Sequence, residues 1–236
     1  MRPVIAATLV VVTVLLALSI SAASASTGAT VSPQALYTAT LKAGQAQRSV
    51  HWTSRAASGG VVIAMVCDVA RTFGIQQISY SDGKGSGKGT VMVVGGNVYV
   101  RGDVRTLTGF MGFNAIPAVK YAGEWIEVPG TDPRFSAVAA GVTLRSAIGQ
   151  LEMTAPFRAL PRTSVHGQSV LAIAGEAPGN ASVGVVLYAR PSGLHLPVGA
   201  VSKSAGAATS IFFSRWNERV VVSKPARAVL ITKTGL

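Results

Sequence analysis

Ser81-Asp82-Gly83-Lys84 has the Ser-x-x-Lys spacing of some acyl-transferring serine enzymes. That chemistry needs the two side chains one turn apart on a helix, so that the lysine amine can take the hydroxyl proton. Here an aspartate and a glycine separate them, and a second glycine follows Lys84, so a turn is predicted instead. We do not expect acyl-transfer chemistry at this position.

The glycine-rich run 83–90 resembles a phosphate-binding loop in composition. The phosphate-loop pattern requires Ser or Thr directly after Gly-Lys, but Gly89 follows Lys88. The run also joins two predicted strands, whereas a phosphate loop joins a strand to a helix. A hairpin loop is therefore the better interpretation.

Metal and thiol chemistry have equally weak signals in this sequence. None of the three histidines, His51, His166 and His195, has a neighbour at metal-ligand spacing. The single cysteine, Cys67, lies in an apolar predicted strand, which favours a buried, inert thiol and excludes an internal disulfide. Glu124 and Glu127 are three apart on a predicted strand and face opposite sides. We therefore expect no enzyme, no metal and no cofactor.

The N-terminal segment 1–25 has the pattern of a secretory signal. Arg2 precedes an uncharged apolar run from Val4 to Ile20, and the small residues Ala23 and Ala25 follow it. We predict cleavage before Ser26 and export of the mature chain in soluble form. The alternative is an uncleaved anchor, but the apolar run is 17 residues, short of the ~20 that a spanning helix needs. No cysteine stands directly after the run, so no lipid anchor is expected.

Basic residues outnumber acidic ones by 21 to 9, and removal of Arg2 with the signal leaves a net charge of +11. The arginines are scattered along the chain, whereas nucleic-acid binders usually concentrate basic residues and interleave aromatics. Outside the cell, a positive surface can meet anionic lipid head groups or acidic wall polymers. The alternative is that the charge only keeps an apolar-rich chain in solution.

The predicted elements that must carry any site are mostly strands. Ser32-Pro33 predicts the start of a helix that ends near Gly44. Strand patterns follow over 49–55, 61–71, 75–81, 90–94 and 97–101. We expect short helical or irregular segments that cover the sheet at 104–110 and 114–121, and a strand at 124–128. Helices are expected at 131–140, with Thr131 as the cap, and at 144–151. Further strands are predicted at 163–166, 169–175, 182–190, 194–201, 209–216 and 220–223.

This order predicts an α+β fold in a single domain, 26–236. Short hairpins make an antiparallel sheet, and so wide a sheet must curl to bury one face. The helices are expected to cover the concave side.

The same organisation resembles the LolA/LppX/LprG-like extracytoplasmic lipid and lipoprotein carriers. The residues that carry the resemblance, in order, are VVGGNVYVR (93–101), GEWIEVP (123–129), a helical segment from Asp132, PSGLHLPV (191–198) and FSRWNERVVV (213–222), closing at Pro225. The resemblance implies a half-barrel of about eleven strands with helices over its mouth, and acyl chains held between them. It also implies an alternative, because relatives of this kind include envelope signalling or scaffold domains that bind a protein or the wall. Lipid-anchored members carry an anchoring cysteine that is missing here.

From the period of two along each strand, we predict a set of inward-facing residues that line a ligand cavity. The set is Leu36, Ile63, Met65, Val91, Val93, Val98, Val100, Leu144, Ile148, Leu151, Val170, Ala172, Val185, Leu187, Ile211 and Phe213. The alternative is that these residues fill a solid core, and a one-residue slip would move any strand's set outward. The predicted function is an exported monomer that binds or carries a lipid-like apolar ligand and no nucleic acid.

Overall fold

Helix α1 (Pro33–Gln45) opens the part of the chain described by the computed structural model, residues 31–233. It begins as predicted, because Ser32 Oγ accepts a hydrogen bond from the backbone N–H of Ala35 at 3.2 Å. Tyr37, Thr40 and Gly44 form its buried face. The predicted signal segment and its cleavage site before Ser26 lie outside the described residues.

Eleven strands of the described chain pair with one another in antiparallel fashion, which confirms the predicted sheet. They are β1 (Ser49–Ser58), β2 (Val61–Ala70), β3 (Gly74–Ser81), β4 (Ser86–Val94), β5 (Asn97–Gly102), β6 (Ile126–Val128), β7 (Thr154–Val165), β8 (Gln168–Ala177), β9 (Asn180–Ala189), β10 (Pro197–Ser204) and β11 (Ala207–Ser214). A short twelfth strand, β12 (Val229–Leu230), pairs in parallel with β6.

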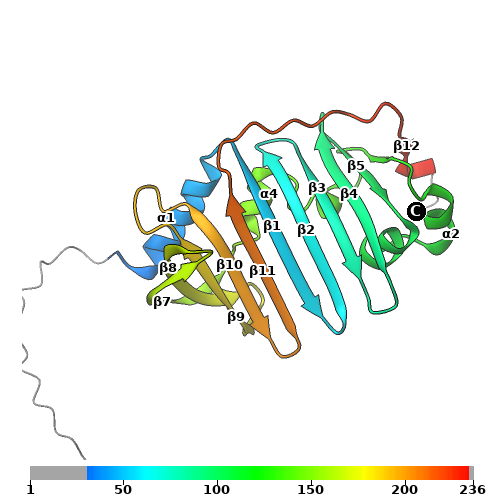
Figure 1. Cartoon of the computed structure of the whole chain (residues 1–236). Helices are drawn as coiled ribbons and strands as arrows, with labels where there is room; N and C mark the ends of the chain where they lie inside the picture. Colours follow the sequence, from blue (N-terminus) through cyan, green and yellow to red (C-terminus); the bar gives the residue numbers. More distant parts are fainter. Residues whose placement is uncertain (1–30, 234–236) are drawn as a thin grey trace, which may run out of the picture. The chain divides into compact units, whose positions relative to one another are not determined.

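The strand order is β12-β6-β5-β4-β3-β2-β1-β11-β10-β9-β8-β7. Hairpins therefore build two meanders, and the pairing of β1 with β11 joins them in the middle of the sheet (Figure 1). This curved α+β half-barrel is the predicted fold class.

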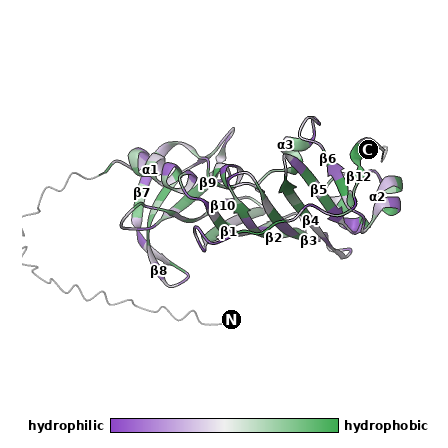
Figure 2. Cartoon of the chain, turned by 90° about the horizontal axis from the view of Figure 1, so that it is seen from above, coloured by the Kyte–Doolittle hydropathy of each residue, from purple (hydrophilic) through white to green (hydrophobic). Residues whose placement is uncertain are grey.

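One face of the sheet is covered by α1 and by the short helices inserted before and after β6 (Figure 2). These are the π-helix η1 (Thr106–Phe110), α2 (Ala115–Tyr121), α3 (Phe135–Val138) and α4 (Leu144–Gly149). A last turn, η2 (Ile231–Lys233), follows β12. Among the described residues, no helix has both the length and the apolar character needed to cross a membrane.

The buried apolar side chains form two clusters side by side on the covered face. The first lies beneath α1 and α4, around Trp52, Ile148 and Phe213. The second lies beneath η1, α2 and α3, around Val98 and Leu107. Met65 packs against both clusters, so it marks the boundary between them.

Four predicted elements differ from the structure. The glycine-rich run 83–90 is a loop only in its first residues, because strand β4 begins at Ser86 rather than at Thr90. Segment 220–223 is not a strand, because residues 215–228 form an irregular stretch, here called the strap, that runs along one end of the strands from β11 to β12 (Figure 1). Strand β7 begins nine residues before Thr163 and contains two prolines, which an edge strand tolerates. Helix α3 begins at Phe135, and Thr131 does not cap it.

Candidate ligand cavity

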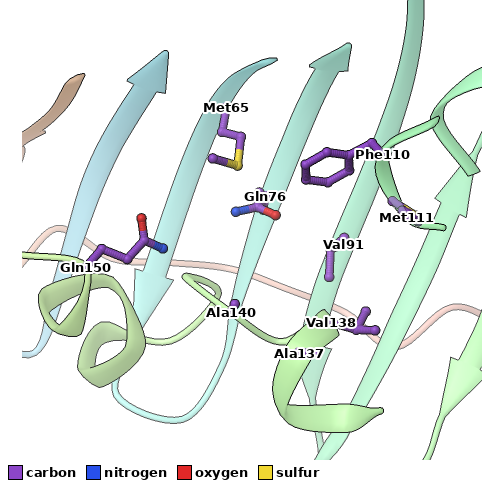
Figure 3. Close-up of a pocket in the computed structure, with 9 residues that line it drawn as sticks. All are labelled: Met65, Gln76, Val91, Phe110, Met111, Ala137, Val138, Ala140 and Gln150. Carbon is purple, nitrogen blue, oxygen red and sulfur yellow. The ribbon is translucent and has the colours of Figure 1, made fainter. Parts of the chain in front are cut away.

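A cavity of about 340 Å³ lies between the covered face of the sheet and the helical insertion. Strands supply Met65, Gln76 and Val91 as its floor, as Figure 3 shows. The remaining wall comes from the segments that cover the sheet: Phe110, Met111, Ala137, Val138, Ala140 and Gln150. The cavity thus sits where the two apolar clusters meet.

The register of β2, β3 and β4 explains which side chains form the floor of the cavity. Gln76 lies directly opposite Val91 on β4 and Cys67 on β2, so these three side chains share the covered face. On the covered face of β4, Gly89 leaves room for the η1 segment. A Cβ at Gly89 would stand 2.8 Å from Thr106 Cγ2 and 3.2 Å from Met111 Cε. Glycine at this position lets the η1 segment approach the sheet closely.

The mouth of the cavity lies where small side chains line it and are exposed to solvent. Ala137 and Ala140 are exposed, and so is Gln150, whereas Gln76 and Val91 on the floor are buried. Helix α3 is held in place at its start by Asp132, which accepts hydrogen bonds from Arg134 Nε and Nη2, both at 2.8 Å. These bonds from Arg134 lower the pKa of Asp132 to about 2.

Two amides interrupt an otherwise apolar wall. Gln76 is only 4% exposed and hydrogen-bonds to the Cys67 thiol, while the Gln150 amide lies at the mouth. Burial raises the pKa of Cys67, and the bond from Gln76 offsets only part of that rise, so the thiol stays neutral. The cavity can therefore receive an apolar group and hydrogen-bond one polar atom.

Of the residues predicted to line a cavity, Met65 and Val91 do line this one. Val93, Val98 and Val100 are at most 3% exposed and belong to the second packed cluster, and Ile63 packs against it. The residues in or against the first packed cluster are Leu36, Leu144, Ile148, Leu151, Val185, Leu187, Ile211 and Phe213.

Val170 and Ala172 lie on the opposite face of the sheet. The register pairs Ile173 with Leu187 and Ala172 with Tyr188, so Ile173 is the β8 residue that joins the first cluster. The strand phase is thus shifted by one residue from the prediction. Both faces of β8 are apolar, so hydrophobicity could not choose between them.

Seven of the nine lining residues are outside the predicted set. Gln76 could have been found, because it alternates with Ile78 and Tyr80 on the covered face of β3. The other six lie on short helices and turns, where no periodicity in the sequence indicates which side chain faces the sheet: Phe110, Met111, Ala137, Val138, Ala140 and Gln150.

A second, polar hollow of about 160 Å³ lies under the strap on the outer face of the sheet. There His51 Nδ1 lies 2.8 Å from Asp68 Oδ1, and Arg215 reaches both side chains. No hydroxyl of the described chain hydrogen-bonds to this imidazole, and the described residues hold no cluster of three metal-ligating side chains. This cluster attaches the strap to β1 and β2.

Comparison with known proteins identifies the fold. The sequence matches no protein-family model and no curated protein. The structure of LprF from Mycobacterium bovis is similar, with a TM-score of 0.55 at 12% identity, over 83% of this chain and 97% of that one. Lipoprotein LppX from Mycobacterium tuberculosis is similar with a TM-score of 0.52 at 19% identity, over 81% of this chain and 100% of that one. The chain therefore has the fold of LprF and LppX, and the resemblance in its sequence is confirmed at the level of the fold.

Proposed function

We propose that this protein is an exported binder or carrier, which holds a lipid-like apolar ligand in the cavity between the curved sheet and its helices. The cavity itself carries the proposal, because its floor and walls are mostly apolar and its mouth is open at Ala137 and Ala140. Apolar pockets with a few polar groups are the usual form of small-molecule sites. The fold shared with LprF and LppX supports the same conclusion.

The size of the cavity narrows the class of ligand. Its volume of about 340 Å³ lies near the lower end of the ~300–1,000 Å³ range of ligand sites. A single alkyl chain or a compact apolar molecule matches this volume better than a lipid with several chains. The Gln150 amide at the mouth can hydrogen-bond a polar head, while the chain lies against Met65 and Val91.

The N-terminal signal pattern supports a site of action outside the cytoplasm. Cleavage before Ser26 releases a chain with no cysteine near its new N-terminus, so the proposed form carries no lipid anchor. A carrier of this kind moves its ligand through an aqueous compartment, where burial of the apolar chain removes it from water.

The direct test is to identify what the protein carries. The mature chain 26–236 is secreted from a bacterial host, extracted with organic solvent and analysed by mass spectrometry. We expect an apolar compound at a fixed ratio to protein. Material that is folded, carries no such compound and binds no apolar fluorescent dye would contradict the carrier function and favour the signalling or scaffold alternative.

A matched pair of tryptophan variants locates the ligand. Ala140→Trp places a large ring at the exposed mouth, where the fold tolerates it, and should reduce dye binding at least about tenfold because the ring blocks entry. Gln77→Trp adds the same ring on the outer face beside Gln76 and should leave dye binding unchanged. Equal binding by both variants would place the dye elsewhere.

A further inference from the structure

The outer face of the sheet carries two adjoining hollows that have no part in the apolar cavity. This is the face turned toward the viewer in Figure 1, with α4 behind it. One hollow, of about 450 Å³, runs from Arg55 on β1 past Ser79 to Lys88 on β4. The second, of about 560 Å³, continues from Lys88 past Arg101 on β5 to Trp125. Because they share Lys88, the two hollows form one groove, here called the outer groove.

Strand register places the cations of the outer groove in a line. Arg55 pairs with Ala64, Ala64 with Ser79 and Ser79 with Lys88. Arg55 therefore lies three strands from Lys88, a distance of about 14 Å. Arg101 pairs with Thr90, two residues along from Lys88, which is a diagonal step of about 7–8 Å. The three positive side chains therefore extend over roughly 20 Å.

None of these three cations is neutralised by a carboxylate. The ion pairs of the described chain involve other basic residues, and the outward-facing acidic residues Asp68 and Glu127 lie at the end of the sheet occupied by the strap. Arg101 instead stacks over the indole of Trp125, with its guanidinium carbon 5.9 Å from the ring centre. Its charge remains available to an anion.

Two acidic groups near the outer groove, Asp103 and Asp82, are already bonded, whereas a third, Glu124, is exposed between the lining residues Gly123 and Trp125. Asp103 lies where the two hollows meet, and its carboxylate accepts hydrogen bonds from the backbone N–H groups of Lys88 and Thr106. Burial alone would raise the pKa of Asp103, but these bonds outweigh it and lower the pKa. Asp82 pairs with Arg105 at 2.9 Å, so that pair adds no net charge.

Hydroxyls line part of the outer groove. Ser79 lies on the row from Arg55 to Lys88, next to Ala64, and Ser81 pairs with Ser86 two residues along. Thr90 pairs with Arg101, and Val62 and Ala64 on β2 are the apolar part of the lining. Hydroxyls both donate and accept hydrogen bonds, so they match the hydroxyl groups of a sugar, and Trp125 offers an aromatic surface at one end. A row of cations spaced by hydroxyls matches a chain that carries both negative charges and sugar hydroxyls.

We propose that the outer groove binds a linear acidic polysaccharide, with Arg55, Lys88 and Arg101 pairing with its negative groups and the serine and threonine hydroxyls bonding to its sugars. An anionic membrane fits the groove less well, because membrane binding is strengthened when apolar side chains insert beside the cations. Among the described residues, none of the large exposed apolar side chains lines the groove; Val66 lies two residues from Ala64 on the same face of β2, and Ile116 and Val119 lie on α2.

The test measures binding of the mature chain to fluorescently labelled polygalacturonate. The triple variant Arg55→Gln, Lys88→Gln, Arg101→Gln removes the line of cations. Its matched control, Arg158→Gln, Arg162→Gln, Arg190→Gln, removes the same charge from exposed positions elsewhere. Neutral dextran and vesicles of phosphatidylglycerol with phosphatidylcholine are the comparison ligands. Circular dichroism and dye binding in the apolar cavity establish that both variants remain folded.

The groove variant should bind polygalacturonate at least about tenfold more weakly, since charge-assisted hydrogen bonds are lost, and the control should stay within about twofold. Binding should also weaken as salt is raised, and dextran should not bind. If the groove variant and the control lose the same affinity for polygalacturonate, binding depends only on the net charge of the protein. That result would overturn the proposed site. Strong binding to vesicles without binding to polygalacturonate would overturn the polysaccharide and assign the groove to a membrane. The dye assay reports on the carrier function separately.

Discussion

The apolar residues Phe213 and Met65 differ in how completely they are packed, since Met65 also faces the cavity. Phe213 is 6% exposed, belongs to the first apolar cluster and stacks on Trp216 with ring centres 5.8 Å apart. Met65 lies between the two clusters with one side against the cavity. Their contributions to stability should therefore differ more than their sizes suggest.

Phe213→Ala should lower the free energy of unfolding by about 3–5 kcal/mol, because it leaves a void in a packed cluster. Met65→Ala should cost about 1–2 kcal/mol, because this side chain already lacks neighbours where it faces the cavity. Urea denaturation measures both. Similar losses would mean that Met65 is packed as tightly as a core residue and that the cavity is filled.

Asp132 provides a pH test at the start of α3. The hydrogen bonds from Arg134 hold its pKa at about 2, below the ~3.9 of a free aspartate. The folded-state pKa is depressed, so the pair's stabilisation is present above about pH 4 and is lost as the pH falls through about 2. Titration of the carboxyl carbon by NMR should show Asp132 ionised at pH 3. Arg134→Gln should return the pKa toward ~3.9, and an unchanged pKa would remove Arg134 as the cause.

At the scale of elements, the strap ties the two meanders of the sheet together. Asn217 anchors its start: its side-chain carbonyl accepts from the backbone N–H of Arg48 at 2.7 Å, and its amide donates to Gln47 Oε1 at 2.7 Å. At the far end, Lys224 Nζ lies 3.8 Å from Glu127 on β6, and β12 then pairs with β6. The strap therefore links β1, where the meanders join, to the edge of the sheet.

Asn217→Ala should lower the free energy of unfolding by about 1–3 kcal/mol. The change removes two side-chain hydrogen bonds and forces alanine into a left-handed backbone conformation, φ +66°. Asn217→Gly keeps that conformation accessible, so it isolates the hydrogen bonds. Glu218→Ala is the control at the neighbouring position. It removes only a surface ion pair, with Glu218 Oε2 3.9 Å from Arg215 Nε, so it should lower the free energy of unfolding by less than about 0.5 kcal/mol. Comparable values for Asn217→Ala and Glu218→Ala would show that the strap is not anchored at Asn217.

At the scale of the whole molecule, the predicted signal segment determines the compartment in which we propose that the cavity and the outer groove act. The pattern Ala23-Ser24-Ala25 predicts a mature protein that begins at Ser26. Ala25→Arg should abolish cleavage, because a large charged side chain replaces the small residue that the peptidase requires. Ser24→Arg changes the unconstrained middle position and should be cleaved normally. Intact mass spectrometry of secreted protein measures both, and a retained Met1 in the unsubstituted chain would favour the uncleaved anchor.

Much of the fold was predictable because it depends on local patterns. The Ser32 cap, the glycine turns and the alternation along Ile63, Met65 and Cys67 each act within a few residues, so the sequence alone indicates α1, the hairpins and the covered face of β2. The resemblance to the LolA/LppX/LprG-like carriers then indicated how the strands join into one half-barrel.

The tertiary structure alone decided the features that depend on contacts distant in sequence. Segment 220–223 has the composition of a strand, but it forms part of the strap rather than pairing. The cavity lies where two clusters fail to fill the space between sheet and helices, and no residue type encodes such a gap. Gln150, Phe110 and Ala140 reach it from short segments whose orientation depends on packing against the sheet. The cations Arg55, Lys88 and Arg101 are scattered in the sequence and become a line only because strand register places them side by side.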